Sequence, residues 1–324
     1  MRAAYVRELG RPPEPGEAPE PERGEGETLA EVLAVPLNPI DINIGAGRFY
    51  GGSPPLPYVP GREGVGRVLE GGGIAAGTLV WLYGGDGGLP SGALAERVAV
   101  PESAVVALPE ETDPAVAGAL GIAGLAGWLP LAHRAPLRAG ETVLVLGATG
   151  TVGLVALQGA RLLGAGRIVA AGRRPEALER ARRLGADAVV SLEEADDLAA
   201  AFRAACGGDG PTYVIDPLWG EPAAAAAAAA AQGARIVNIG QSAGAEAPLR
   251  SADVRGKQLE VLGFSIFHTP REALEREYLR LVGHANAGEL EVELERFPFE
   301  RVAEAWERQA QGAGAKVVVE VASA

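Results

Sequence analysis

The sequence predicts an α/β fold in which a doubly wound parallel sheet follows a mainly β part of the chain. Two observations support this prediction. From about residue 117 to residue 263, short apolar runs alternate regularly with helical patterns, and such βα alternation is typical of a parallel sheet covered by helices. Before about residue 115, strand-like runs are short and are separated by proline and glycine, which is typical of a barrel-like all-β unit.

The predicted strands of the first part are short apolar runs bounded by turn-forming residues. They are Leu29–Val35, Gly64–Leu69, Thr78–Tyr83 and Leu94–Val100.

The alternating part is predicted to consist of strands and helices in strict succession. Strands are expected at 142–146, 167–171, 188–191, 212–216 and 234–239, helices at 151–163, 175–184, 196–205 and 221–231, and a last apolar run at 259–267. The alanine-rich stretch 223–231 is predicted to be plain helix, because alanine is the best helix former. Beyond it we expect helices at 271–287 and 299–311, and a strand at 315–321 that can return to the first part.

A glycine-rich loop directly follows the first strand of the alternating part. Gly147 permits a tight turn, Gly150 lets backbone N–H groups approach a pyrophosphate, and Gly153 lets the following helix lie close to its strand. The N-terminus of that helix adds partial positive charge. We therefore predict a dinucleotide site, with phosphate-binding residues Gly147, Thr149, Gly150, Thr151, Val152 and Gly153.

The end of the next strand indicates which nicotinamide cofactor is bound. NAD sites usually carry an acidic residue about 20 residues after the loop, hydrogen-bonded to the ribose 2′-hydroxyl. This chain has Gly172 there, followed by Arg173 and Arg174. Guanidinium groups bind phosphate through charge-assisted paired hydrogen bonds, so we predict that these three residues contact a 2′-phosphate and that the cofactor is NADPH. The alternative is that both arginines merely solvate the start of the next helix.

Composition narrows the class of protein. The formal charge of −13 and the pI of about 4.9 make nucleic-acid binding an unfavoured role. No apolar run approaches the roughly 18 residues that span a bilayer, so no membrane role is expected. The first residues lack a signal-peptide core and Cys206 is the only cysteine, so we expect a cytoplasmic protein.

The whole length resembles the medium-chain dehydrogenase/reductase superfamily, in its zinc-independent quinone oxidoreductase (zeta-crystallin-like) branch. The landmarks are Val35–Asp41, Pro60–Gly66, Gly121–Trp128, Gly147–Gly153 and Gly314–Glu320. The resemblance implies a GroES-like, mainly β catalytic domain formed by residues 1–116 and 264–324, with a Rossmann NADPH-binding domain at 117–263 inserted in it. It also implies an active site in the cleft where the domains meet, and a homodimer paired through the last apolar run.

No metal site is expected. Zinc-dependent relatives carry Cys where this chain has Asn38 and His where it has Arg62, and their cluster of four cysteines has no counterpart here. A catalytic zinc needs about three N, S or carboxylate ligands, and the three histidines are scattered. The resemblance places Glu63 beside the missing zinc histidine, and we expect it to pair with Arg62 or with polar backbone in a structural role.

The absence of a Lewis acid indicates the reaction class. Alcohol–carbonyl interconversion needs a strong polariser for the developing alkoxide, whereas hydride transfer to a quinone or an α,β-unsaturated carbonyl spreads charge onto a distant oxygen. We therefore predict an enzyme, an NADPH-dependent oxidoreductase acting on such a small-molecule substrate. The alternatives are an enoyl reductase acting on a CoA- or carrier-linked chain, and an NADPH-binding protein with little turnover.

The resemblance places three candidate catalytic residues. Asn38 aligns with an asparagine near the nicotinamide and the substrate; its alternative role is a turn before Pro39. Two cleft tyrosines of the family read Asn43 and Phe49 here, with Tyr50 one place later, so Tyr50 either turns inward or caps a loop. The third candidate is His268.

His268 follows the last Rossmann strand, where the family lines the substrate pocket. It would either donate a proton to a reduced quinone oxygen or stand at the surface, and Phe264 would supply an apolar wall. The resemblance also assigns cofactor contacts to Asn238, Ile239, Gly240, Gln241 and Phe264. Lys316 matches a basic position that can approach the pyrophosphate, although an ordinary exposed lysine is the alternative.

Overall fold

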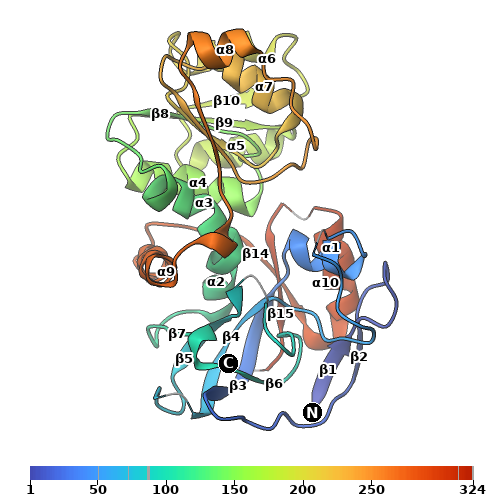
Figure 1. Ribbon diagram of the computed structural model, residues 1–324. Coiled ribbons are helices and arrows are strands. Elements are labelled where there is room, and N and C mark those ends of the chain that lie inside the picture. The colour runs from blue at the N-terminus through green and yellow to red at the C-terminus, as the bar shows by residue number, and fades with distance from the viewer. Residues whose placement is uncertain (50, 72, 86–87, 313, 323–324) are drawn as a thin grey trace. The chain divides into compact units, whose positions relative to one another are not determined.

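A computed structural model describes residues 1–49, 51–71, 73–85, 88–312 and 314–322 (Figure 1). The chain forms two compact units. Unit 1 consists of Met1–Ala123, Tyr278–Ala287 and Val292–Ala324, and unit 2 of Gly124–Glu277 and Gly288–Glu291.

Unit 1 is built on a mainly antiparallel sheet in the order β14-β15-β3-β4-β5-β7, with β6 also paired to β3. Its strands are β3 (Glu27–Pro36), β4 (Glu63–Gly71), β5 (Leu79–Tyr83), β6 (Arg97–Pro101), β7 (Val105–Ala107), β14 (Leu294–Pro298) and β15 (Lys316–Glu320). The predicted return of the last strand is confirmed, because β15 pairs antiparallel with β3 and aligns Val319 with Val35. A separate antiparallel pair joins β1 (Arg2–Tyr5) to β2 (Glu14–Glu17).

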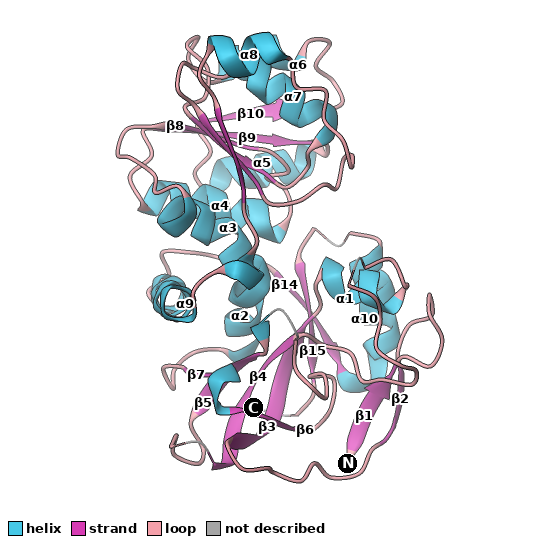
Figure 2. Cartoon of the chain, viewed as in Figure 1, coloured by secondary structure: helices cyan, strands magenta, loops and turns pink. Residues whose placement is uncertain are grey.

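The helices of unit 1 pack against this sheet or against one another. They are α1 (Pro39–Gly45), α2 (Pro114–Ala119) and α10 (Val302–Ala310). Helices α1 and α10 lie side by side (Figure 2). A Cβ atom at Gly45 would lie 2.6 Å from Cζ2 of Trp306, so this close approach requires glycine.

Unit 2 contains a six-stranded parallel sheet in the order β10-β9-β8-β11-β12-β13. The strands are β8 (Thr142–Val145), β9 (Arg167–Gly172), β10 (Ala188–Ser191), β11 (Tyr213–Asp216), β12 (Arg235–Asn238) and β13 (Glu260–Gly263). The helices are α3 (Leu125–Leu129), α4 (Thr151–Leu162), α5 (Pro175–Arg183), α6 (Leu198–Ala205), α7 (Gly220–Ala229) and α8 (Ser251–Gly256), and α9 (Arg271–Asn286) begins here.

Alternate residues of these strands form two cores. Val143 and Val145 of β8 pack with residues of α4 and α5, whereas Leu144 packs on the other face with Phe202 of α6 and with alanines of α7. Figure 1 shows helices on both faces of this sheet. The doubly wound prediction is therefore confirmed, and the alanine-rich stretch is helical as far as Ala229.

The compact units and the predicted domain boundaries differ at two segments. Residues 117–123 belong to unit 1, where the Ile122 N–H donates to the Glu63 carboxylate at 2.9 Å. Residues 264–277 belong to unit 2, where the Trp128 indole N–H donates to Glu277 at 3.0 Å and the Arg134 side chain donates to the Gly263 carbonyl at 3.1 Å.

One helical stretch of the described chain, Pro114–Arg134, is long and apolar enough to cross a membrane by length and composition. Our expectation that no apolar run approaches this length was therefore wrong. However, 83% of its apolar window is buried inside the structure, as in the core helix of a folded protein.

Candidate functional site

The strand order of unit 2 locates a ligand crevice. β8 and β11 are neighbours, and the chain runs outward from them in opposite directions along the sheet. In such sheets, ligands bind outside the carboxyl ends of the strands at this switch point. The loops that follow β8, β9, β11 and β12 all lie at that edge, and they contain most of the predicted cofactor residues.

The glycine loop has the geometry that phosphate binding requires. Gly147 has a φ of 60°, which favours glycine. A Cβ atom at Gly153 would lie 2.4 Å from the Gly147 carbonyl oxygen, so helix α4 packs against the loop backbone. A Cβ atom at Gly150 would meet nothing within 4 Å. The open space therefore lies at the N-terminus of α4, where Thr151 and Val152 begin the first turn with N–H groups that have no partner inside the helix.

The end of β9 lies against this loop. A Cβ atom at Gly172 would lie 2.5 Å from Cγ2 of Thr149. Arg173 and Arg174 follow and are exposed, and within the described chain neither guanidinium forms a hydrogen bond or an ion pair. Two cationic side chains thus stand next to the phosphate loop and are available to a ligand.

Asn238 and Asp216 tie together the ends of β12 and β11. The Asn238 side-chain amide donates to the Asp216 carboxylate at 3.0 Å and to the Gly240 carbonyl at 2.8 Å. The fully buried Asp216 also accepts from the N–H groups of Leu218 and Trp219. Burial raises the pKa of Asp216, and these donors oppose the rise. Asn238 therefore shapes the loop, and Ile239, Gly240 and Gln241 continue along the crevice edge.

A pocket of about 430 Å³ lies beside the ends of β12 and β13. It is lined by Asn238, Phe264 and His268, which are three of the predicted site residues, and also by His133 and Arg134. Two of the three histidines, His133 and His268, thus line the same pocket. Sequence reasoning missed His133 and Arg134, because only the folded chain brings the end of the 130–134 turn to this loop.

Unit 1 contains a buried polar network around Asn38. The Asn38 amide N–H donates to the Glu63 carboxylate at 2.8 Å, and its oxygen accepts from the Lys316 ammonium at 2.6 Å. Lys316 also donates to the Leu37 carbonyl, and Glu63 accepts from the Trp81 indole at 2.9 Å. Asn38, Glu63 and Lys316 expose 1%, 0% and 3% of their surface.

Burial shifts the pKa values of two ionisable groups in this network, Glu63 and Lys316. It raises the pKa of Glu63 to about 7, although Lys316 and the hydrogen bond from Asn38 oppose the rise. It lowers the pKa of Lys316 to about 8, opposed by the charges of Glu63 and Asp41. Asp41 lies in the first turn of α1, and burial raises its pKa too, although its oxygens accept from the N–H groups of Asn38 and Arg62.

These contacts revise several expectations. The alternative that Lys316 is an ordinary exposed lysine is wrong, because its side chain is buried. Its ammonium donates hydrogen bonds to the Leu37 carbonyl and to the Asn38 side-chain oxygen. Glu63 contacts polar backbone as expected, through Ile122, but its side-chain partners Asn38 and Trp81 were not foreseen. Tyr50 lies outside the described residues.

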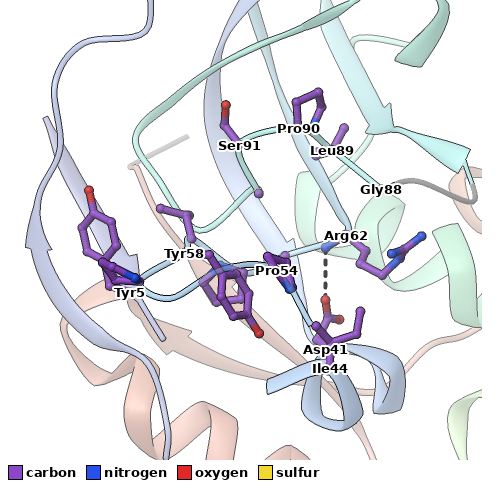
Figure 3. A pocket seen from close by; sticks show the side chains of 15 residues that line it. Tyr5, Asp41, Ile44, Pro54, Tyr58, Arg62, Gly88, Leu89, Pro90 and Ser91 are labelled. Atoms are coloured by element: carbon purple, nitrogen blue, oxygen red, sulfur yellow. Dashed lines mark hydrogen bonds between the residues drawn. The ribbon is translucent and has the colours of Figure 1, made fainter. Parts of the chain in front are cut away.

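A second pocket, of about 350 Å³, lies within unit 1. Figure 3 shows its lining, with Tyr58 and Tyr5 on one side and Asp41 and Arg62 on the other. Its remaining walls are largely proline, glycine and aliphatic residues. Among the residues that the structure describes, no group of three or more His, Cys, Asp or Glu side chains is placed to hold a metal ion.

Two protein families match parts of the chain. Residues 24–110 match the family described as alcohol dehydrogenase GroES-like domain. Residues 151–283 match the family described as zinc-binding dehydrogenase.

Individual relatives are similar over longer stretches. The quinone oxidoreductase of Pongo abelii is 28% identical over 323 residues, which cover 97% of this chain and 95% of the relative. The 2-methylene-furan-3-one reductase of Solanum lycopersicum is 34% identical over 190 residues, which cover 55% of this chain and 48% of the relative. The quinone oxidoreductase of Thermus thermophilus, solved alone and in complex with NADPH, is 33% identical with a TM-score of 0.81, and the match covers 99% of this chain and 100% of that one.

Proposed function

This chain belongs to the quinone oxidoreductase branch of the medium-chain dehydrogenase/reductase superfamily, and from this premise we propose that it is a zinc-independent reductase that transfers hydride from NADPH to a quinone or an α,β-unsaturated carbonyl. The assignment of NADPH as the cofactor rests on Arg173 and Arg174. Both are exposed and without a partner in the described chain, at the strand end that touches the phosphate loop. The Thermus relative solved with NADPH supports the same choice.

The residues of unit 2 bind and orient the cofactor. Backbone N–H groups at the start of α4 hold the pyrophosphate, and the charge of that helix end adds to them. Arg173 and Arg174 hold the 2′-phosphate in charge-assisted pairs. Asn238, fixed by Asp216, holds the loop of Ile239, Gly240 and Gln241 toward the nicotinamide end, with Phe264 as its apolar neighbour. When bound, NADPH supplies the hydride from its nicotinamide ring.

Zinc independence is supported by the surroundings of Asn38, which stands where zinc-dependent relatives carry a cysteine ligand. The Asn38 side chain is 1% exposed, and its polar atoms are bonded to Lys316 and Glu63. An ammonium group next to this position would oppose a divalent cation. Asn38 then has a structural role in the site, and the hydrogen bond from Lys316 holds the Asn38 side chain in place.

Proton delivery to the reduced oxygen is assigned to His268 or to solvent. His268 lines a pocket shared with Phe264 and His133, and it is exposed at the pocket edge. A protonated imidazole can act as a general acid toward such an oxygen.

The assembly proposed is a homodimer in the cytoplasm. Strand β13 is paired only on the β12 side within the described chain, and Val261 on it is 38% exposed. An edge strand with unpaired N–H and C=O groups is a template for a second strand, here that of another copy.

The experiment is a comparison of acceptors. NADPH oxidation is followed by its absorbance with a 1,4-quinone and with an enone, each offered separately. Turnover of either supports the proposal, and the preferred acceptor separates quinone from enone chemistry; the Solanum relative motivates the enone arm. No turnover with both, despite measured NADPH binding, would contradict it.

A further inference from the structure

The pocket beside the ends of β12 and β13 is lined by basic side chains and by no carboxylate. His133, Arg134 and His268 contribute to its walls, and none of the described residues that line it is Asp or Glu. The whole chain has 42 acidic and 29 basic residues, so this lining differs in sign from the molecule as a whole. A cleft lined by charge of one sign attracts a ligand of the opposite sign, and the lining therefore favours an anion.

The turn 130–136, which carries His133 and Arg134, is held at both ends by buried side chains. At its start the hydroxyl of Tyr213 donates to a backbone carbonyl at 2.6 Å, and at its end the guanidinium of Arg235 donates to two backbone carbonyls at 3.1 and 2.9 Å. Tyr213 lies on β11 and Arg235 on β12, so the sheet fixes the position of the turn. A ligand that binds to a fixed turn does not have to order it first.

The Arg134 side chain is oriented by one contact that leaves its terminal nitrogens available. Its Nε–H donates to the carbonyl of Gly263, the last residue of β13, at 3.1 Å. Within the described chain its other N–H groups form no hydrogen bond or ion pair, and neither do the side chains of His133 and His268. A guanidinium stays charged at neutral pH and presents paired N–H groups that match a carboxylate. The imidazoles offer further N–H donors.

The rest of the lining suits the body of a small organic molecule. Phe264 packs against the core of unit 2, and its N–H donates to the Asn238 carbonyl at 2.9 Å. Pro270 adds a second apolar surface. The volume of about 430 Å³ accommodates a compound of one or two rings. A ligand can therefore place a ring against Phe264 and a carboxylate against Arg134.

We propose that this pocket binds the carboxylate of an acidic acceptor, and that Arg134 and His133 hold it. The inference rests on the proposed function, in which Asn238 and Phe264 serve the nicotinamide end of the cofactor and His268 delivers a proton. It narrows the substrate class from quinones and α,β-unsaturated carbonyls in general to those that also carry a carboxylate.

The test measures binding without turnover, in the protein saturated with NADPH. The phosphate sites are then filled by the cofactor, so an added anion reports on other positions. Benzoate and benzamide serve as probes, because they have nearly the same shape, differ in charge and accept no hydride. Their dissociation constants are measured by equilibrium dialysis. The parent protein should bind benzoate roughly tenfold more tightly than benzamide, as expected for a hydrogen bond between charged groups.

Three variants test the groups that hold the carboxylate. Arg134→Gln removes the charge and the paired donors, and the two dissociation constants should become nearly equal. Arg138→Gln is the matched control, because Arg138 is exposed, lies four residues further along the chain and does not line the pocket; it should keep the preference of the parent protein. Ser265→Asp adds a carboxylate to the lining at a helix N-cap, where aspartate is well tolerated, and should reverse the preference. All three variants should bind NADPH as the parent protein does, which shows that they are folded.

The same probes connect the pocket with the acceptor. In the NADPH oxidation assay, benzoate should raise the KM of the acceptor without changing kcat, in the parent protein and in Arg138→Gln but not in Arg134→Gln. Benzamide should have a much weaker effect.

The outcomes separate this inference from the proposed function. Equal binding of the two probes by the parent protein, a preference that survives Arg134→Gln, or benzoate that leaves the KM of the acceptor unchanged would overturn the inference, while NADPH oxidation with an acceptor would still support the function. Benzoate binding that depends on Arg134, together with no NADPH oxidation by any acceptor, would support the anion site and contradict the function.

Discussion

The buried carboxyl group of Glu63 should titrate near neutral pH, and replacing it with Gln should remove that titration. Burial raises its pKa from 4.5 to about 7. The unfolded carboxyl loses its proton from about pH 4.5, whereas the folded one keeps it until near pH 7. The folded state therefore binds more protons in this window, and its stability falls as pH rises. At 1.36 kcal/mol per pKa unit, the loss is about 3 kcal/mol.

Lys316 affects the stability of the protein in a separate, higher pH range. Burial lowers its pKa from 10.5 to about 8, so between these values the unfolded state binds more protons and stability rises with pH. The two effects can thus be told apart by their sign and their pH range.

The assay is the indole N–H resonance of Trp81 in a pH titration. Trp81 donates to the Glu63 carboxylate at 2.9 Å, so its shift follows the charge of Glu63. The expected midpoint is near pH 7, and Glu63→Gln should abolish the transition. The control is Glu277→Gln, which removes the carboxylate bonded to the Trp128 indole and should leave the Trp81 titration intact. A Trp81 midpoint near the ordinary carboxyl value, or a transition that survives Glu63→Gln, would refute the reasoning.

Three further predictions concern unit 2. Replacing either Arg173 or Arg174 with Ala should weaken NADPH binding by roughly tenfold to hundredfold while sparing NADH, since each lost charge-assisted bond contributes about 1.5–3 kcal/mol. Equal losses for NADPH and NADH in calorimetric titrations would contradict the 2′-phosphate assignment. Gly153→Ala should destabilise the protein by about 1–3 kcal/mol in urea unfolding, because its Cβ would lie 2.4 Å from a backbone oxygen. The control Gly150→Ala should keep the stability of the parent protein and lose NADPH affinity. Equal stabilities of the two variants would argue against the close packing of α4. Val261→Lys should convert the proposed dimer to monomer in sedimentation, and a mass equal to that of the parent protein would exclude the β13 edge as the interface.

Local features of the chain were predictable from the sequence. The phosphate loop is contained in a few consecutive residues whose types are dictated by turn geometry and close packing, and Gly147 and Gly153 have the roles expected of them. The parallel sheet followed from regular alternation, and its strand order matches a fold with a switch point.

Features that depend on distant residues could not be predicted. Asn38 meets its partners Glu63 and Lys316 only because β15 pairs with β3 and β3 with β4. A lysine in a terminal strand looks like an exposed residue until its neighbours are known. The shared pocket of His133 and His268 likewise depends on how a turn and a loop approach each other.

The central claim is hydride transfer from NADPH without a metal. The most direct test strips the protein with a strong chelator, measures its zinc content by elemental analysis, and compares NADPH oxidation with a quinone before stripping, after stripping and after zinc is added back. The account predicts no stoichiometric zinc and the same rate in all three states. A rate that is lost on stripping and restored by one zinc per chain would contradict it.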